Sequence, residues 1–446
     1  MKRLALLLLC TVVCATAFHA RAAEPPRHVV IVSVDGLMAD YYGKADALGL
    51  KIPTLRRLIR EGAWARGVTG VLPTVTYPSH TTLITGVLPR VHGIFFNTIF
   101  DPEERSAGSW YYYASAIRVP TLIGAARAAG LKTGAVSWPV SVGSDADFLI
   151  PEFTRPGSSH EIDRELLQQL STPNLIDAIE KSMGRRYGYP PKEEDRMQAA
   201  LYILKAYQPR LMLLHLIDTD SAQHTHAPQS AEAKQAVEQA DANLGRLIEG
   251  VQQAGLGERT LFAVVSDHGF LPTGTFSRPN TLLREAGLLT LNDQNKVTTW
   301  KAFFHGSGGS AALHLKDPND SATLERVRAL IAEKAKDPAS GIRDVLGPDA
   351  IRGFGGADLP MVLNAREGFY FQNPAFGPWS VPSTNKGGHG HAPDREELRA
   401  TLILSGAGLV KKGDLGVVRM TQIAPTIAEY LGLSLSKQAD APLPVW

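Results

Sequence analysis

Four short clusters of aspartate and histidine border apolar runs of the sequence, and side chains of these two types bind metal ions. The clusters read DG, DTDSAQHTH, SDHG and GGHGH, and the first three directly follow the runs VVIVSV, LMLLHLI and LFAVV. Their candidate ligands are Asp35, Asp220, His224, Asp267, His268 and His389. Taken singly, each cluster is more typical of a turn or a polar surface. Four of them at the carboxyl ends of strands in one sheet, where such sheets bind ligands, favour a metal site.

The spacing within the clusters agrees with this interpretation. Asp220 and His224 are four residues apart, so one helical turn would point both side chains the same way. Asp267 and His268 are adjacent and would face opposite sides of a strand, so they can converge only where the chain has left the sheet, as Gly269 indicates. Carboxylate and imidazole ligands without sulfur suit Zn²⁺ best, with Mn²⁺ or Fe as substitutes.

Three aspartates and three histidines exceed the three protein ligands that one catalytic metal ion normally keeps. They suit two ions about 3.5–4 Å apart, a spacing used to clamp an in-line displacement at phosphorus. In the stretch LPTVTYPSHTTLITG (72–86), Thr76 lies just before Pro78 at the expected start of a helix, where an anion can bind. Helix capping is the ordinary role of such a residue, whereas a metal ion or base that removes its proton would make it a nucleophile.

Strands and helices alternate in the segments that must position these residues. The segments RHVVIVSVDG, LKTGAVSW, RLMLLHLID and RTLFAVVSDHG predict buried strands, and PTLIGAARAAG, QAVEQADANLGRLIEGVQQAG and TQIAPTIAEYLGL predict helices. This order predicts an α/β fold with a mostly parallel sheet that is covered by helices on both faces. Residues 277–385 interrupt the alternation and predict a smaller α+β insertion or cap between two parts of a catalytic core, 23–276 and 386–446.

The first 22 residues predict a secretory signal peptide, with Lys2 and Arg3 before an apolar run too short to span a bilayer and Ala-Arg-Ala at the cleavage site. Cleavage would remove three of the 46 basic residues and none of the 44 acidic ones, which changes the formal charge from +2 to −1. No basic excess then predicts a nucleic-acid-binding patch. Both cysteines leave with the leader, and we expect a periplasmic or secreted protein without a transmembrane segment.

Several of these motifs resemble those of the nucleotide pyrophosphatase/phosphodiesterase (type I phosphodiesterase) branch of the alkaline phosphatase superfamily. PTVTYPSH is similar to the family pattern Pro-Thr-x-Thr-aromatic-Pro-Asn-His, and the following TLITGVLPRVHGIFFN continues the likeness to its closing Asn. DSAQHTHAP, SDHG and GGHGH resemble later motifs of the family in the expected order. The resemblance implies an alkaline-phosphatase-like three-layer sandwich, two Zn²⁺ ions and a small-molecule phosphodiester or nucleotide substrate.

Carried over residue by residue, the resemblance implies a role for each motif position. Asn97 would donate to a phosphate oxygen, Tyr77 would lie where the family has an aromatic that stacks on a nucleobase, and Thr76 would be the nucleophile. Ser79, Gln223 and Ala227 depart from the family pattern without removing a ligand. The implied ligands of the first Zn²⁺ are Thr76, Asp35, Asp267 and His268, and those of the second are Asp220, His224 and His389.

The implied reaction is hydrolysis of a phosphodiester or pyrophosphate bond through a phospho-threonine intermediate. An alkaline phosphomonoesterase on the same scaffold remains an alternative, although the Lys-x-Arg pair of some such enzymes is absent between Asn97 and Glu180. A secreted zinc-binding protein without turnover is a second alternative. The sequence does not identify the physiological substrate or the oligomeric state.

Overall fold

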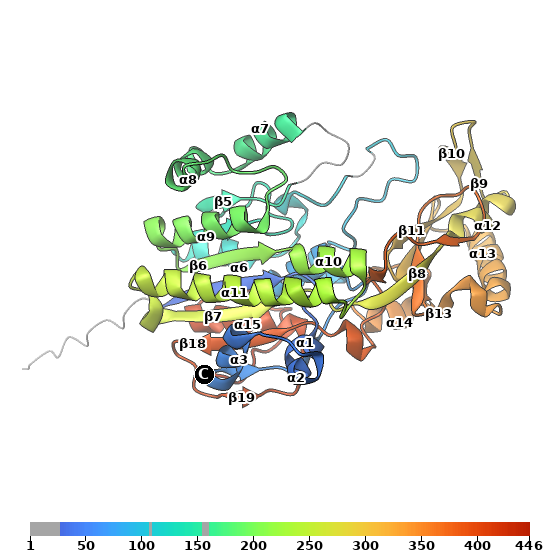
Figure 1. Ribbon diagram of the computed structural model, residues 1–446. Coiled ribbons are helices and arrows are strands. Elements are labelled where there is room, and N and C mark those ends of the chain that lie inside the picture. The colour runs from blue at the N-terminus through green and yellow to red at the C-terminus, as the bar shows by residue number, and fades with distance from the viewer. Residues whose placement is uncertain (1–26, 107–108, 154–159) are drawn as a thin grey trace, which may run out of the picture.

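The computed structural model describes residues 27–106, 109–153 and 160–446, so the predicted signal peptide lies outside the described residues. An eight-stranded sheet forms the centre of the core (Figure 1). In spatial order its strands are β19 (Gly413–Asp414), β2 (Ala63–Trp64), β18 (Leu402–Gly406), β7 (Thr260–Val265), β1 (His28–Val34), β6 (Leu211–Leu216), β4 (Thr133–Val136) and β5 (Phe148–Ile150).

Five neighbouring strands of this sheet, from β7 to β5, run parallel, and β18 is antiparallel to both β7 and β2. The predicted mostly parallel sheet is therefore confirmed. A two-stranded sheet of β3 (Gly67–Thr69) and β20 (Val417–Arg419) lies outside it. Successive side chains of β1 point to opposite faces of the sheet and pack into two different hydrophobic clusters, so this strand needs apolar residues on both faces.

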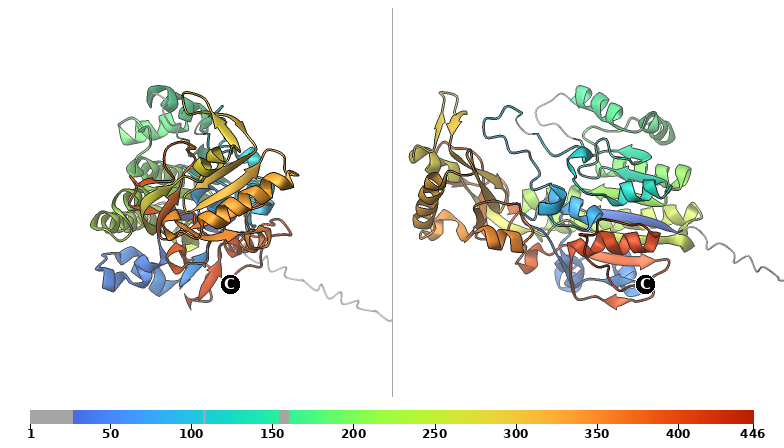
Figure 2. Two further views of the ribbon diagram at one scale, coloured as in Figure 1. Left: turned by 90° about the vertical axis from the view of Figure 1, so that its right-hand side faces the viewer. Right: turned by 180° about the vertical axis from the view of Figure 1, so that it is seen from behind.

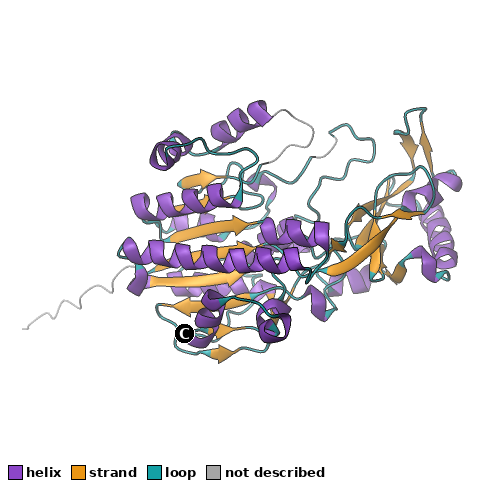
Figure 3. Ribbon diagram, in the orientation of Figure 1, coloured by secondary structure: helices purple, strands orange, loops and turns teal. Residues whose placement is uncertain are grey.

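Helices cover both faces of the sheet, as Figure 3 shows in purple. Val30 and Val32 of β1 pack in one cluster with α3 (Pro53–Glu61), α8 (Leu175–Met183), α9 (Glu193–Tyr207) and α11 (Ala231–Gln253). Val29 and Ile31 pack on the opposite face with α4 (Thr76–Thr85), α6 (Leu122–Ala128) and α15 (Ile423–Leu431). The other core helices are α1 (Ala39–Gly43), α2 (Ala45–Leu48), α5 (Pro89–His92), α7 (His160–Leu170) and α10 (Asp218–His226).

The region after β7 builds two further sheets and a separate hydrophobic cluster at one end of the core (Figures 1 and 2). The first sheet is antiparallel and consists of β11 (Ala302–Ser307), β12 (Ser310–Leu315), β14 (Val362–Ala365) and β13 (Ile342–Leu346). The second joins β8 (Leu271–Ser277) to β15 (Gly368–Phe371), β16 (Ser380–Pro382) and β17 (Gly387–Gly388). The same region also contains a hairpin, formed by β9 (Leu289–Leu291) and β10 (Val297–Trp300), and three helices, α12 (Pro279–Glu285), α13 (Ser321–Lys334) and α14 (Pro348–Gly353).

Strand pairing crosses the start of the insertion that the sequence predicts at 277–385, because Thr275 and Phe276 of β8 lie before it and pair with β16 inside it. The same strand also pairs at Leu271 and Pro272 with β17, beyond the predicted end. The division into domains therefore stays a prediction. Figure 1 shows that β6 and β7 point toward this region, so it faces the carboxyl ends of the parallel strands. Among the described helices, none is both long and apolar enough to cross a membrane.

Candidate metal centre

The six candidate ligands lie together at the carboxyl edge of the large sheet. Asp35 directly follows β1, Asp220 and His224 lie in α10 after β6, and Asp267 and His268 follow β7. His389 comes from the chain just beyond β17. These positions explain how adjacent residues such as Asp267 and His268 both reach the site, because β7 ends at Val265 and the chain has left the sheet.

Asp220, His224 and His389 form one group of close ligand atoms. Asp220 Oδ1 lies 3.4 Å from His224 Nε2 and 3.6 Å from His389 Nε2. The Nε2 atoms of His224 and His389 are 3.2 Å apart. These distances bring three potential ligand atoms to one point, which is the arrangement that a bound metal ion needs.

A second group forms around His268. Its Nε2 atom lies 3.5 Å from Asp35 Oδ1 and 3.1 Å from Asp267 Oδ2. Asp220 can also place an oxygen within 4.8 Å of ligand atoms of Asp35 and His268, so it borders both groups. The structure thus brings all six predicted side chains into two adjoining clusters, although the division of ligands between two ions stays a proposal.

The three histidines point the same nitrogen into the clusters. Each uses Nδ1 to donate to a backbone carbonyl: His224 to Gly387 at 2.9 Å, His389 to Thr74 at 3.0 Å, and His268 to Gly269 at 3.2 Å. This bond fixes the tautomer and leaves an Nε2 lone pair for a metal ion, as is usual for metal-binding histidines. Two such lone pairs cannot face each other at 3.2 Å between His224 and His389 without a cation between them.

Buried polar atoms without partners give a second test of whether metal ions fit. Within the described residues, Asp35 Oδ1, Asp220 Oδ1, Asp267 Oδ2 and His268 Nε2 are buried and accept or donate no hydrogen bond. Leaving such atoms unpaired is unfavourable, and native proteins rarely do so. One metal ion in each cluster would satisfy these four atoms, so the donor set fits two metal ions that prefer oxygen and nitrogen ligands.

The electrostatics of the six side chains agree with that test. Burial, together with the carboxylates of Asp267 and Asp220, raises the pKa of Asp35 well above its usual value. Burial also raises the pKa of Asp220 to about 6, lowers that of His268 to about 3 and lowers that of His389 well below 6.5. The acids therefore repel one another while the imidazoles stay neutral, and positive charge from metal ions would stabilise the cluster.

Thr76 begins α4 and has a side chain that is 9% exposed. The helix is tied to the ligand clusters through His80, whose Nδ1 donates to the Thr76 carbonyl at 2.8 Å and lies 3.6 Å from Asp267 Oδ2. Burial lowers the pKa of His80 to about 3, and its Nε2 can accept from the Ser33 hydroxyl at 2.9 Å. The neutral His80 side chain therefore connects α4 to β1 and to the candidate ligand Asp267.

Asn97 and Tyr77 lie beside Thr76 in different environments. The Tyr77 N–H donates to Asn97 Oδ1 at 2.9 Å, which orients the amide so that its Nδ2 group can serve as a donor. The Tyr77 ring is only 1% exposed and lies 5.1 Å from the Trp110 ring, and its hydroxyl donates to Glu152 Oε1 at 3.0 Å. Because Trp110 covers this ring, stacking of Tyr77 on a nucleobase stays a prediction.

Two residues that belong to no sequence motif, His215 and Glu152, hold Asp35 in place through hydrogen bonds. His215 Nε2 donates to Asp35 Oδ2 at 3.0 Å, and its Nδ1 donates to Glu152 Oε2 at 2.8 Å. Burial alone would lower the pKa of His215, but the bonds to Asp35 and Glu152 raise it to about 10. His215 lies inside the apolar run LMLLHLI, and a lone polar residue in a buried strand was the one signal available.

Two histidines of the sequence motifs lie outside the two clusters. His226, at the end of α10, is exposed, and its Nδ1 lies 3.8 Å from Glu232. His391 is buried, and neither of its ring nitrogens has a partner in the part of the chain that the structure describes. Of the two histidines in DTDSAQHTH only His224 joins a cluster, and of the two in GGHGH only His389 does.

Comparison with known proteins identifies the family of the chain. Residues 29–353 match the family model described as "Type I phosphodiesterase / nucleotide pyrophosphatase". Human ectonucleotide pyrophosphatase/phosphodiesterase family member 1 is 26% identical over 257 residues, which cover 55% of this chain and 23% of the relative. Venom phosphodiesterase 2 of Crotalus adamanteus is 28% identical over 250 residues, or 54% of this chain and 26% of the relative. The chain thus spans about a quarter of the length of these curated relatives.

Solved structures show the same fold over most of the chain. Human ectonucleotide pyrophosphatase/phosphodiesterase 5 superposes with a TM-score of 0.65 and 19% identity, covering 92% of this chain and 96% of that one. The murine protein, an inactive threonine-to-alanine variant in complex with AMP, gives a TM-score of 0.63 with 20% identity over 93% and 96% of the two chains. The resemblance of the motifs is thereby confirmed, and the chain belongs to the type I phosphodiesterase/nucleotide pyrophosphatase family.

Proposed function

We propose that this protein is a two-zinc phosphodiesterase or nucleotide pyrophosphatase that hydrolyses its substrate through a phospho-threonine at Thr76. One observation carries the proposal. Three imidazole Nε2 atoms and three aspartates meet at the carboxyl edge of the sheet. The helix that begins with Thr76 lies against that cluster, because His80 Nδ1 is 3.6 Å from Asp267 Oδ2 and His389 donates to the carbonyl of Thr74, just before the helix. A zinc-storage protein would need the ligands but neither Thr76 nor Asn97.

The proposed ligands follow from the two clusters. One Zn²⁺ would be held by Asp35, Asp267, His268 and the Thr76 hydroxyl, and the other by Asp220, His224 and His389. Mn²⁺ or Fe would suit the same donors. When bound, such ions lower the pKa of a coordinated hydroxyl or water and neutralise negative charge that develops at phosphorus.

The residues of the chain would position the reacting groups. Thr76 Oγ1 would form the bond to phosphorus while the ester oxygen of the leaving group departs on the opposite side, and a water molecule would then release Thr76. Asn97 would hold a nonbridging phosphate oxygen with its Nδ2 group, because its Oδ1 is already occupied by the Tyr77 N–H. The Thr76 N–H at the amino end of α4 would also donate to the phosphate, and the helix dipole there favours an anion.

The relatives support this choice of reaction. They are named phosphodiesterases and nucleotide pyrophosphatases, and the murine structure pairs an inactive threonine-to-alanine variant with AMP. A phosphodiester or nucleotide is therefore the proposed substrate. We also propose a periplasmic or secreted location, which rests on the leader sequence of residues 1–22.

The test compares kcat/KM for bis(p-nitrophenyl) phosphate and p-nitrophenyl phosphate on zinc-loaded and chelator-treated protein. We expect a strong preference for the diester that disappears with the metal and returns when zinc is added back. A preference for the monoester would keep the metal site but assign the protein to the phosphomonoesterases. Tight zinc binding without cleavage of either ester would contradict an enzymatic function.

A further inference from the structure

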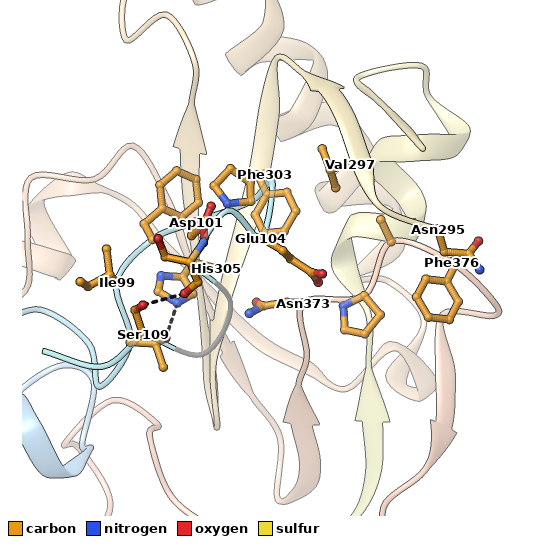
Figure 4. A pocket seen from close by; sticks show the side chains of 16 residues that line it. Ile99, Asp101, Glu104, Ser109, Asn295, Val297, Phe303, His305, Asn373 and Phe376 are labelled. Atoms are coloured by element: carbon orange, nitrogen blue, oxygen red, sulfur yellow. Dashed lines mark hydrogen bonds between the residues drawn. The ribbon is translucent and has the colours of Figure 1, made fainter. Parts of the chain in front are cut away.

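A cavity of about 310 Å³ lies beside the segment that carries Asn97 (Figure 4). We call it the side cavity. One wall is formed by residues 98–102, Glu104, Ser106 and Ser109, and the other by Asn295, Val297 of β10, Phe303 and His305 of β11, and residues 373–376. Thr98 Oγ1 and His305 Nε2, 3.0 Å apart, join the two walls by a hydrogen bond.

The side cavity begins one residue from the proposed phosphate-binding group. Thr98 lines it and directly follows Asn97, and consecutive Cα atoms are about 3.8 Å apart. Tyr77 is bonded to the same Asn97 from the side of α4. A diester held at Asn97 would have one arm on the α4 side of this residue and would direct its other arm into the side cavity, whose volume suits a small organic group.

The charges that line the side cavity disfavour an anion. Asp101 and Glu104 line it, whereas none of its lining residues, all of which the structure describes, is a lysine or an arginine. Burial lowers the pKa of His305 to about 4, so this side chain is neutral at pH 7. Arg278 lies 5.9 Å from the Phe376 ring but does not line the cavity. A pyrophosphate group would thus meet carboxylates of the same charge.

The remaining lining residues offer stacking surfaces and hydrogen bonds. Phe100, Phe303 and Phe376 present aromatic rings. Asn373 Oδ1 accepts from the Gly306 N–H at 2.7 Å, so its Nδ2 group can donate to a ligand. His305, which is 3% exposed, keeps a buried Nδ1 without a partner among the described residues. Rings combined with amide, imidazole and carboxylate groups are the chemistry that binds a nucleobase and its sugar.

We propose that the side cavity binds the second organic arm of a phosphodiester, an uncharged nucleoside or similar ring-bearing alcohol. This inference rests on the proposed function and narrows its substrate class. A diester with two organic arms, such as a dinucleoside monophosphate, would place one arm on the α4 side of Asn97 and the other in the side cavity. Nucleoside triphosphates fit less well, because their second arm is a pyrophosphate that the carboxylates of Asp101 and Glu104 repel.

The test measures kcat/KM for adenylyl-adenosine and for ATP on the zinc-loaded wild type and two variants. Phe376→Ala removes a ring that is 38% exposed, and Glu104→Lys reverses a charge on an exposed segment, so neither disturbs the buried core. Val417→Ala, which truncates another exposed apolar side chain on β20, is the matched control.

We expect the wild type to prefer adenylyl-adenosine. Phe376→Ala should lower kcat/KM for adenylyl-adenosine about tenfold, as loss of a stacking contact does, and leave that for ATP unchanged. Glu104→Lys should raise kcat/KM for ATP severalfold, and Val417→Ala should change neither value.

A wild-type preference for ATP, or equal effects of the variants on both substrates, would overturn the inference. Hydrolysis of bis(p-nitrophenyl) phosphate that depends on Thr76 would in that case leave the proposed function standing. If that diester is not hydrolysed either, both proposals fall together.

Discussion

The carboxyl edge of the large sheet and the insertion sheet both bury histidines, but the two sets of histidines have different neighbours. At the edge, His268 and His389 face aspartates, and their Nδ1 atoms donate to backbone carbonyls. In the insertion, His305 and His314 lie against the Phe96 and Phe100 rings, at centroid distances from 3.9 to 6.3 Å. Burial lowers the pKa in both regions, to about 3 for His268 and about 4 for His305.

The comparison shows that burial and a lowered pKa do not identify a metal ligand. What distinguishes the edge is that carboxylate oxygens without partners surround each Nε2 atom. In the insertion, His305 Nε2 is bonded to the neutral Thr98 hydroxyl. The difference between the regions can be tested by substitutions that should act on one and leave the other unchanged.

The largest effect is expected for Thr76→Ala at the edge. Removal of the nucleophile should lower kcat for a diester by on the order of 10³-fold or more. Zinc content, measured by atomic absorption, should fall little because the aspartates and histidines remain. The control in the insertion is Thr323→Ala, which removes another buried hydroxyl and should leave kcat unchanged. Full turnover of Thr76→Ala with normal zinc content would refute the assigned nucleophile.

A paired substitution compares the histidines directly. His389→Ala removes a proposed ligand and should weaken zinc binding by more than about 100-fold, as measured by competition with a chromogenic chelator. His305→Ala removes a buried imidazole of the insertion and should leave the zinc affinity unchanged. Equal zinc affinities for the two variants would mean that the edge is no more a metal site than the insertion is.

A smaller effect is expected for Glu152→Gln, because Glu152 is not among the proposed metal ligands. Glu152 accepts from His215, and His215 holds Asp35. Loss of the charge should loosen Asp35 and reduce zinc affinity by about 10-fold, the lower end for groups that support metal ligands. Glu161→Gln on exposed α7 is the control. An unchanged zinc affinity of Glu152→Gln would show that this support is not needed.

The smallest effect concerns the insertion and its response to pH. The pKa of His305 is about 4 in the folded protein, below the usual 6.5, because burial disfavours the charged form. Above pH 6.5 His305 is neutral in both the folded and the unfolded protein, and its titration costs no stability. As the pH falls from 6.5 toward 4, only the unfolded chain gains the proton, so the free energy of unfolding decreases. Between pH 7.5 and pH 5 the loss should be about 1–2 kcal/mol.

This loss is measured on metal-free protein as the difference in unfolding free energy between wild type and His305→Gln at each pH. The other histidines titrate in both proteins, so their effects cancel in the difference. A difference that does not vary with pH would show that His305 is not held neutral by burial.

Periodicity and motif spacing were sufficient to predict the mostly parallel sheet, several of its helices, among them α6, α11 and α15, and the ends of β1, β6 and β7. These features are local, because a run of apolar residues that ends in Asp35 or Asp267 forms a strand and leaves the acid at the strand end. The motif order also predicted which six side chains would meet. The sheet explains this success, since parallel strands place their carboxyl ends at one edge.

Contacts of residues outside the motifs could not be predicted from the sequence. His215 resembles an ordinary member of an apolar strand until β6 pairs with β1 and brings it 3.0 Å from Asp35. Glu152 belongs to no motif, and the side cavity needs two segments about 200 residues apart to close around it, with Thr98 bonded to His305. Packing between such segments depends on three-dimensional shape rather than on local pattern, so it becomes visible only when the chain is folded.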